Sequence, residues 1–144
     1  MRLWHKDLIS YLPRQQLLGQ WRECCLIAKN IKEKGTPNHI LVNKIMNYPL
    51  VHFYNYCGLV MQEMETRGYK CNKNKFWDNV ALEYSEAIPF VPKSFIFGKW
   101  HNLKYLKQCY YNLQEKYDCG GISDTEWEIV QKNFWDLVAN KNYK

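Results

Sequence analysis

Residues 13–35 read PRQQLLGQWRECCLIAKNIKEKG, and this stretch determines how the rest of the chain is interpreted. Apolar residues recur in it at intervals of four, three, four and three, at Leu17, Trp21, Cys24, Ala28 and Ile31. That spacing forms one face of an amphipathic helix. Proline suits the first turn of a helix, and glycine suits the cap that follows its last turn. The stretch therefore predicts a long first helix from about Pro13 to Lys34.

Further helical patterns follow. We expect a short helix within Thr36–Asn47, a second long helix from Pro49 to Gly68, a shorter one over Phe76–Glu86, and another over His101–Lys116. Gly120 and Gly121 end that segment, and Ser123 with Glu126 forms the S-x-x-E capping box of a last helix. Residues 88–92, IPFVP, cannot form regular helix because each proline removes a hydrogen bond, so we expect an ordered crossing segment there.

The fold class follows from these patterns. No alternating run with hairpin turns indicates a sheet, and the chain shows no internal repeat. At 144 residues it is long enough to bury one core. The sequence therefore predicts an all-α fold in a single compact domain covering residues 1–144.

The composition argues against several classes of protein. The hydrophobic fraction of 47% argues against disorder, and no apolar run approaches the roughly 18 residues of a membrane span. The N-terminus lacks the apolar region of a secretory signal, so we expect a cytoplasmic protein with its six cysteines reduced and no metal site. The net charge of +6 permits a polyanionic partner without demonstrating one.

One polar group on the first helix is a candidate site. Arg22 and Glu23 turn away from the buried stripe, and Gly19 lies one turn before them. The pair can be an ordinary solvated helix face. Gly19 admits two interpretations, close approach of a bound strand or the N-terminal segment, and close helix–helix packing. The signatures G-x-S-x-G, G-x-x-x-x-G-K-[ST] and H-E-x-x-H are absent.

The first seventy residues resemble the phage pyrimidine-dimer DNA glycosylases, often called endonuclease V, and especially a bacterial branch of that family. The residues that carry the resemblance are Gln15, Leu17, Arg22 and Glu23, then Glu63 followed by Arg67-Gly68-Tyr69, and the stretch from Met1 to Cys25. The resemblance extends to about Tyr69. It implies an endonuclease V-like fold and a bifunctional DNA glycosylase and abasic-site lyase that needs no cofactor.

In such an enzyme the N-terminal α-amine attacks C1′ of the damaged nucleotide, a Schiff base forms, and β-elimination cuts the strand. The phage enzymes lose their initiator methionine, whereas the bulky Arg2 here leaves Met1 in place, so the resemblance implies that the amine is that of Met1. Glu23 would stabilise positive charge on the sugar and move protons, and Arg22 would disfavour the protonated amine and pair with phosphate.

The implied partner is double-stranded DNA with damaged bases, bound by a monomer. A further arginine of the family is Leu26 here, so phosphate contacts are expected from Arg14 and Lys29, with Arg2 as the basic residue beside the terminus. His5 could contact phosphate or cap and pack, and Trp4 could stack on a base or anchor the N-terminal arm. The later aromatic residues are expected in helices, mainly in the core: Trp100, Tyr105, Tyr110, Tyr111 and Trp135.

Two alternatives remain open from the sequence. The first is a non-catalytic DNA-binding or interaction protein that retains the fold and needs no free amine. The second is a helical protein whose site lies elsewhere, in which case the Arg22-Glu23 match is accidental.

Overall fold

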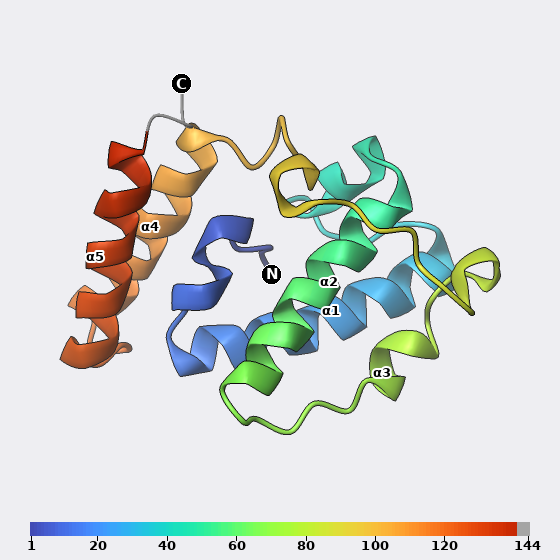
Figure 1. Ribbon diagram of the computed structural model, residues 1–144, viewed down its shortest axis with the longest axis horizontal. Coiled ribbons are helices and arrows are strands. Elements are labelled where there is room, and N and C mark those ends of the chain that lie inside the picture. The colour runs from blue at the N-terminus through green and yellow to red at the C-terminus, as the bar shows by residue number, and fades with distance from the viewer. Residues whose placement is uncertain (141–144) are drawn as a thin grey trace.

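The first long helix, α1, spans Arg14–Lys34, as its apolar periodicity predicts (Figure 1). The computed structural model describes residues 1–140. Pro13 occupies the N-cap, and Gly35 ends the helix in the left-handed conformation at φ 75°, where glycine carries no steric penalty. The Gly35 N–H donates to the carbonyl of Ile31, which satisfies one of the last carbonyls of the helix.

The other long helices lie close to their predicted positions. They are α2 (Leu50–Thr66), α4 (Leu103–Asp118) and α5 (Asp124–Ala139). Shorter elements are α3 (Asn74–Trp77) and the 3-10 turns η1 (Lys6–Tyr11), η2 (Asn43–Asn47), η3 (Leu82–Tyr84) and η4 (Lys93–Phe95). Residues 1–140 contain no strand, so the prediction of an all-α fold is confirmed. The helix expected within Thr36–Asn47 is present as the single 3-10 turn η2.

The predicted helix over Phe76–Glu86 is wrong. Helix α3 ends at Trp77, and the chain resumes helical geometry only in the three residues of η3. The reason is Tyr54 of α2, whose hydroxyl accepts the Ala81 N–H at 3.0 Å. The rings of Phe76 and Tyr84 pack edge-on against the Tyr54 ring, with centroids at 5.7 and 5.9 Å. Tertiary contact with one side chain thus overrides the local helical preference.

The proline-containing segment 88–92 is an ordered crossing segment, as predicted. The Asn55 side chain of α2 donates to the Pro89 carbonyl at 2.9 Å and accepts the Val91 N–H at 3.1 Å. A side-chain amide therefore satisfies main-chain groups that the prolines prevent from joining a helix.

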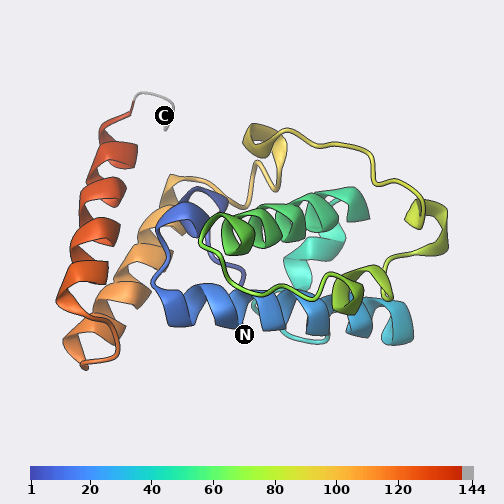
Figure 2. The ribbon, with the colours of Figure 1, turned by 60° about the horizontal axis from the view of Figure 1, so that its bottom comes forward.

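The helices form two groups with the N-terminal segment between them (Figures 1 and 2). Helix α1 packs on α2. Helices α4 and α5 form an antiparallel pair, and α5 also contacts η1. The pair is joined by stacked rings, with Tyr110 and Phe134 at 3.7 Å between centroids and an interplanar angle of 5°. Of the later aromatic residues, Trp100, Tyr105 and Tyr110 are buried, whereas Tyr111 and Trp135 are more than half exposed.

Candidate active site at the N-terminus

The N-terminal segment runs past the middle of α1, and two side chains of α1 bind its main chain. The Arg2 N–H donates to Glu23 Oε2 at 3.1 Å. The Gln20 amide donates to the Arg2 carbonyl at 3.0 Å and accepts the Trp4 N–H at 2.7 Å. The helix that carries the Arg22-Glu23 pair is thus also the helix that fixes the start of the chain.

Two tyrosines from other helices hold the same segment. The Tyr56 hydroxyl of α2 donates to the Trp4 carbonyl at 2.5 Å and lies 3.1 Å from Gln20 Oε1. The Tyr105 hydroxyl of α4 donates to the Leu3 carbonyl at 2.5 Å. We call Gln20, Tyr56 and Tyr105 the N-terminal clamp. Burial raises the pKa of both tyrosines, so their hydroxyls remain proton donors.

Glu23 is half-buried beside the start of the chain. Its Oε2 also lies 3.5 Å from the Gln20 amide nitrogen. Within residues 1–140 neither Glu23 nor the Met1 amine forms an ion pair, and the nitrogen that contacts the carboxylate is the Arg2 amide. The Met1 amine is the main-chain nitrogen immediately before the Arg2 amide that Glu23 holds. A carboxylate in this place can stabilise a cation or accept a proton from a neighbouring group.

Arg22 and Gly19 lie on the outer surface of α1. Arg22 is exposed, and the described residues give it no ion pair. A Cβ built on Gly19 would meet the Arg22 Nη2 at 3.8 Å and nothing else within 4 Å. Neither another helix nor the N-terminal segment uses the space at Gly19, so the helix–helix packing interpretation is wrong. Approach of a bound strand stays a prediction.

The residues predicted to contact phosphate differ in their exposure to solvent. Arg14 and Lys29 are exposed on α1, and Arg2 is half-buried with its guanidinium 5.6 Å from the Trp4 ring centroid. His5 is fully buried, and its Nδ1 accepts the Asp7 N–H at 3.1 Å, which caps η1. Trp4 is 7% exposed and anchors the N-terminal arm. The structure thus places the arginines and Lys29 at the surface and His5 in the interior.

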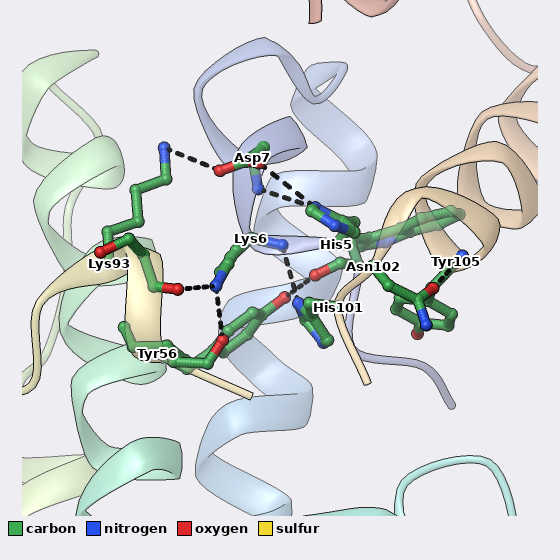
Figure 3. A network of polar contacts seen from close by, with 11 residues as sticks. His5, Lys6, Asp7, Tyr56, Lys93, His101, Asn102 and Tyr105 are labelled. Atoms are coloured by element: carbon green, nitrogen blue, oxygen red, sulfur yellow. Dashed lines mark hydrogen bonds and ion pairs between the residues drawn. The ribbon is translucent and has the colours of Figure 1, made fainter. Parts of the chain in front are cut away.

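Three buried basic residues, His5, Lys6 and His101, form a network next to the N-terminal segment (Figure 3). The Lys6 N–H donates to His101 Nδ1 at 3.0 Å, and the Lys6 ammonium donates to the carbonyls of Ile96 and Ser94 at 2.7 and 3.2 Å. Desolvation lowers the pKa of His5 to about 4, with the Asp7 carboxylate acting in the opposite direction. Desolvation also lowers the pKa of Lys6 and of His101. Because carbonyls hold the Lys6 ammonium, we assign Lys6 a structural role.

Sequence reasoning missed a groove next to Arg2. It has a volume of about 510 Å³, and a neighbouring hollow of about 470 Å³ shares Lys44 and Trp100 with it. Ile40 is 84% exposed at its rim. Its cations are Arg2 and Lys44, with Lys99 in the neighbouring hollow, and no acidic residue is among the described residues that line either one. The groove combines positive charge with exposed apolar and aromatic surface.

Among residues 1–140, no group of three or more His, Cys, Asp or Glu side chains could hold a metal ion. The six cysteines are free. No described helix is long and apolar enough to cross a membrane.

The first half of the chain is similar to a known protein family. The family described as pyrimidine dimer DNA glycosylase matches residues 1–77, which include α1, Glu23 and the first two clamp residues. No curated protein and no solved structure matches the chain. Because the match covers more than half of the 144 residues, the chain belongs to the pyrimidine dimer DNA glycosylase family.

Proposed function

We propose that this protein is a DNA repair glycosylase with abasic-site lyase activity on pyrimidine dimers or related lesions, and that its nucleophile is the Met1 amine. The observation that carries the proposal is the hydrogen bond of 3.1 Å between the Arg2 N–H and Glu23 Oε2. It holds the second residue of the chain against a carboxylate, and the proposed mechanism needs an acid–base group near the N-terminal amine.

The chemistry proceeds in two stages. The amine nitrogen forms a bond to C1′ as the bond from C1′ to the base breaks, and the base leaves with the electron pair and takes up a proton. The nitrogen then loses one proton, and its lone pair forms the C1′=N bond as the C1′–O4′ bond breaks. The sugar ring opens, O4′ takes up a proton, and a protonated Schiff base results. Loss of a proton from C2′ then breaks the bond from C3′ to its oxygen, and the 3′ phosphate leaves. Glu23 would stabilise the positive sugar and accept protons in the imine and elimination steps.

An α-amine suits this role because it must be neutral to attack. Amines at chain termini have a reference pKa of about 7.7–8.0, against about 10.4 for lysine, so a larger fraction is neutral near pH 7. No lysine needs to act as the nucleophile, and Lys6, the lysine nearest the segment in sequence, is engaged with carbonyls.

We infer that DNA is bound along the outer face of α1 and at the groove beside Arg2. Arg22 and Lys29 are two helical turns apart and both exposed, and a guanidinium pairs with phosphate through two parallel hydrogen bonds. Arg14 would add a contact at the start of the helix. His5 is not part of this proposed surface because it is buried. Reaching a lesion in duplex DNA also requires nucleotide extrusion, at a cost of a few kcal/mol.

The whole chain is proposed to act as one domain and as a monomer on damaged double-stranded DNA. The support for one domain is a single buried cluster that contains residues from Leu3 to Phe134. Helices α4 and α5, which lie beyond the family match, contribute to that cluster, and α4 also contributes Tyr105 to the proposed site.

The test is covalent trapping. The protein is incubated with abasic duplex DNA and borohydride, and a covalent adduct is expected, with mass spectrometry placing the DNA on the Met1 α-nitrogen. N-terminal acetylation should abolish the adduct, and Glu23→Gln should slow its formation by a factor of about 100. Glu33→Gln, an exposed change on the same helix, is the control and should leave the rate unchanged.

The outcomes separate the alternatives. Failure to form an adduct, or an adduct that survives both acetylation and Glu23→Gln, would contradict the amine mechanism. Salt-dependent DNA binding without an adduct would fit a non-catalytic DNA-binding protein instead. An adduct on the Arg2 nitrogen, after loss of Met1, would support the amine mechanism and show that the nucleophile is the amine of Arg2.

A further inference from the structure

The start of the chain is held by side chains rather than by secondary structure. Side chains of α1, α2 and α4 bind the N–H of Arg2, the carbonyls of Arg2 and Leu3, and both main-chain groups of Trp4. The first residues of a domain are commonly poorly ordered unless something ties them down. Here three helices supply a separate partner for nearly each main-chain group, which fixes the path of the segment residue by residue.

Gln20 is the centre of this arrangement. It is 1% exposed and lies between Leu17 and Cys24 in the otherwise apolar face of α1. Its amide nitrogen bonds the Arg2 carbonyl and lies 3.5 Å from Glu23, while its oxygen receives the Trp4 N–H. A buried amide needs partners, and these partners have fixed directions, so Gln20 sets the register of the segment against Glu23.

The tyrosines add constraints from two other elements. Tyr56 is fully buried and Tyr105 is 9% exposed, so their hydroxyls act in an environment largely without competing water. Tyr105 belongs to α4, outside residues 1–77 that the family matches. The C-terminal half of the chain therefore completes the environment of the N-terminal segment.

We propose that Gln20, Tyr56 and Tyr105 are positioning residues, which hold the N-terminal segment so that its amine stands beside Glu23 in attacking geometry. This inference rests on the proposed amine mechanism. Gln20 and Tyr56 are buried away from the proposed DNA surface, whereas Tyr105 also lines the groove beside Arg2, where Tyr105→Phe keeps the ring. They act through the main chain of residues 2–4, and a misplacement of about 1 Å at a reacting group can slow a reaction about 100-fold.

The clamp can be altered one hydrogen bond at a time. Gln20→Glu keeps an oxygen toward the Trp4 N–H and removes the donor toward the Arg2 carbonyl and Glu23. Tyr56→Phe and Tyr105→Phe remove a hydroxyl and keep the ring. Tyr54→Phe is the matched control, because Tyr54 is a buried tyrosine of α2 whose hydroxyl bonds the Ala81 N–H instead.

Two quantities are measured for each variant. The single-turnover rate of borohydride trapping is taken at saturating abasic duplex, and the Kd for the same duplex is taken without reductant. We expect the trapping rate to fall about 10- to 100-fold in the three clamp variants, with Kd within about twofold of the unaltered protein. Tyr54→Phe should leave both quantities unchanged. Amide exchange at Trp4 should become faster in Gln20→Glu and Tyr56→Phe, because Gln20 binds the Trp4 N–H and Tyr56 binds the Trp4 carbonyl.

The result that would overturn the inference is an unchanged trapping rate in all three clamp variants, or a Kd that weakens in parallel with the rate. The phenylalanine variants keep the test valid if Gln20→Glu fails to fold. Failure of the proposed function is distinguishable, since the unaltered protein would then form no adduct, and the inference would fall with it. Loss of trapping confined to the variants, at constant Kd, supports both.

Discussion

At Gly19, stability favours alanine, whereas the proposed function favours glycine. A glycine inside a helix costs about 1 kcal/mol relative to alanine. A Cβ at this position would meet the Arg22 guanidinium at 3.8 Å, an ordinary contact, and nothing else within 4 Å. We therefore expect Gly19→Ala to raise the free energy of unfolding by about 1 kcal/mol, measured by urea denaturation.

The same substitution should slow trapping of abasic DNA, since the added methyl group occupies the space that we assign to the bound strand. Gly58→Ala is the control, because Gly58 lies in the interior of α2 with nothing within 4 Å of its Cβ position. It should stabilise the protein to a similar extent and leave trapping unchanged. Equal trapping by both variants would mean that no strand approaches Gly19 closely.

At the scale of single residues, the sequence predicted part of the candidate site. Glu23 could be proposed because its position relative to the apolar stripe and the family resemblance both indicated it. Gln20 could have been noticed as a polar residue within that stripe, next to Leu17 and Cys24. Its partners could not, because the clamp brings Tyr56 and Tyr105 to a segment about fifty and one hundred residues earlier, and no local pattern encodes that pairing.

At the scale of elements, Glu126 joins the starts of two helices. Ser123 and Glu126 form the predicted capping box of α5, in which the Ser123 hydroxyl accepts the Glu126 N–H at 3.2 Å. The second carboxylate oxygen of Glu126 accepts the N–H of Arg14, the first residue of α1, at 2.7 Å. The Arg14 N–H is also the main reason that the pKa of Glu126 is lower than its usual value. One carboxylate thus accepts the first N–H of α1 and the hydroxyl of Ser123, the residue that caps α5.

We expect Glu126→Ala to lower the free energy of unfolding at pH 7 by about 0.5–2 kcal/mol, the range for loss of a helix cap. Because the pKa of the carboxyl is lowered by folding, its contribution is present at neutral pH and is lost as the pH falls through its value in the folded protein. Glu128→Ala, an exposed change on the same helix, should have little effect. Equal effects of the two substitutions at pH 7 would show that the contact with Arg14 contributes no stability.

The helices that the sequence predicted well are those whose signals are local. Helices α1, α2, α4 and α5 carry a periodic apolar face and a glycine, asparagine or serine at an end, and all of these act within a few residues. The helix predicted over Phe76–Glu86 was wrong because helical spacing of Phe76 and Tyr84 does not require a helix between them. The chain between them is irregular and lets both rings reach Tyr54. Periodicity reports which residues are buried and cannot report which neighbour buries them.

At the scale of the whole molecule, the buried basic network links parts of the chain that are nearly one hundred residues apart. The rings of His5 and His101 lie 5.0 Å apart between centroids with an interplanar angle of 31°, and the Lys6 N–H joins the N-terminal segment to His101. The charged groups facing His5 are Lys6, Asp7 and Lys93, of which Asp7 alone favours its protonated form. The sequence left open whether His5 contacts phosphate or packs, because burial of a single histidine depends on the complete fold.

This network predicts destabilisation by acid. The pKa of His5 is 6.5 in an ordinary environment and about 4 in the folded protein, so unfolding binds protons as the pH falls between those values. The stability that neutral His5 provides is fully present above pH 6.5 and declines toward pH 4, by about 3 kcal/mol for this residue. His101, whose pKa is also lowered by burial, adds to the decline. Urea denaturation between pH 7 and pH 4 measures the slope.

His5→Asn isolates the titration from the cap, since an asparagine side chain can still accept the Asp7 N–H but does not ionise. His39→Asn is a matched control, because His39 Nδ1 also accepts an N–H two residues later, from Leu41 at 3.2 Å, but His39 lies in a half-buried loop outside the network. We expect His5→Asn to flatten the dependence of stability on pH and His39→Asn to leave it unchanged. A decline of the same steepness in the His5 variant would mean that other groups govern acid unfolding, and that the junction between the N-terminal segment and α4 does not depend on a neutral His5.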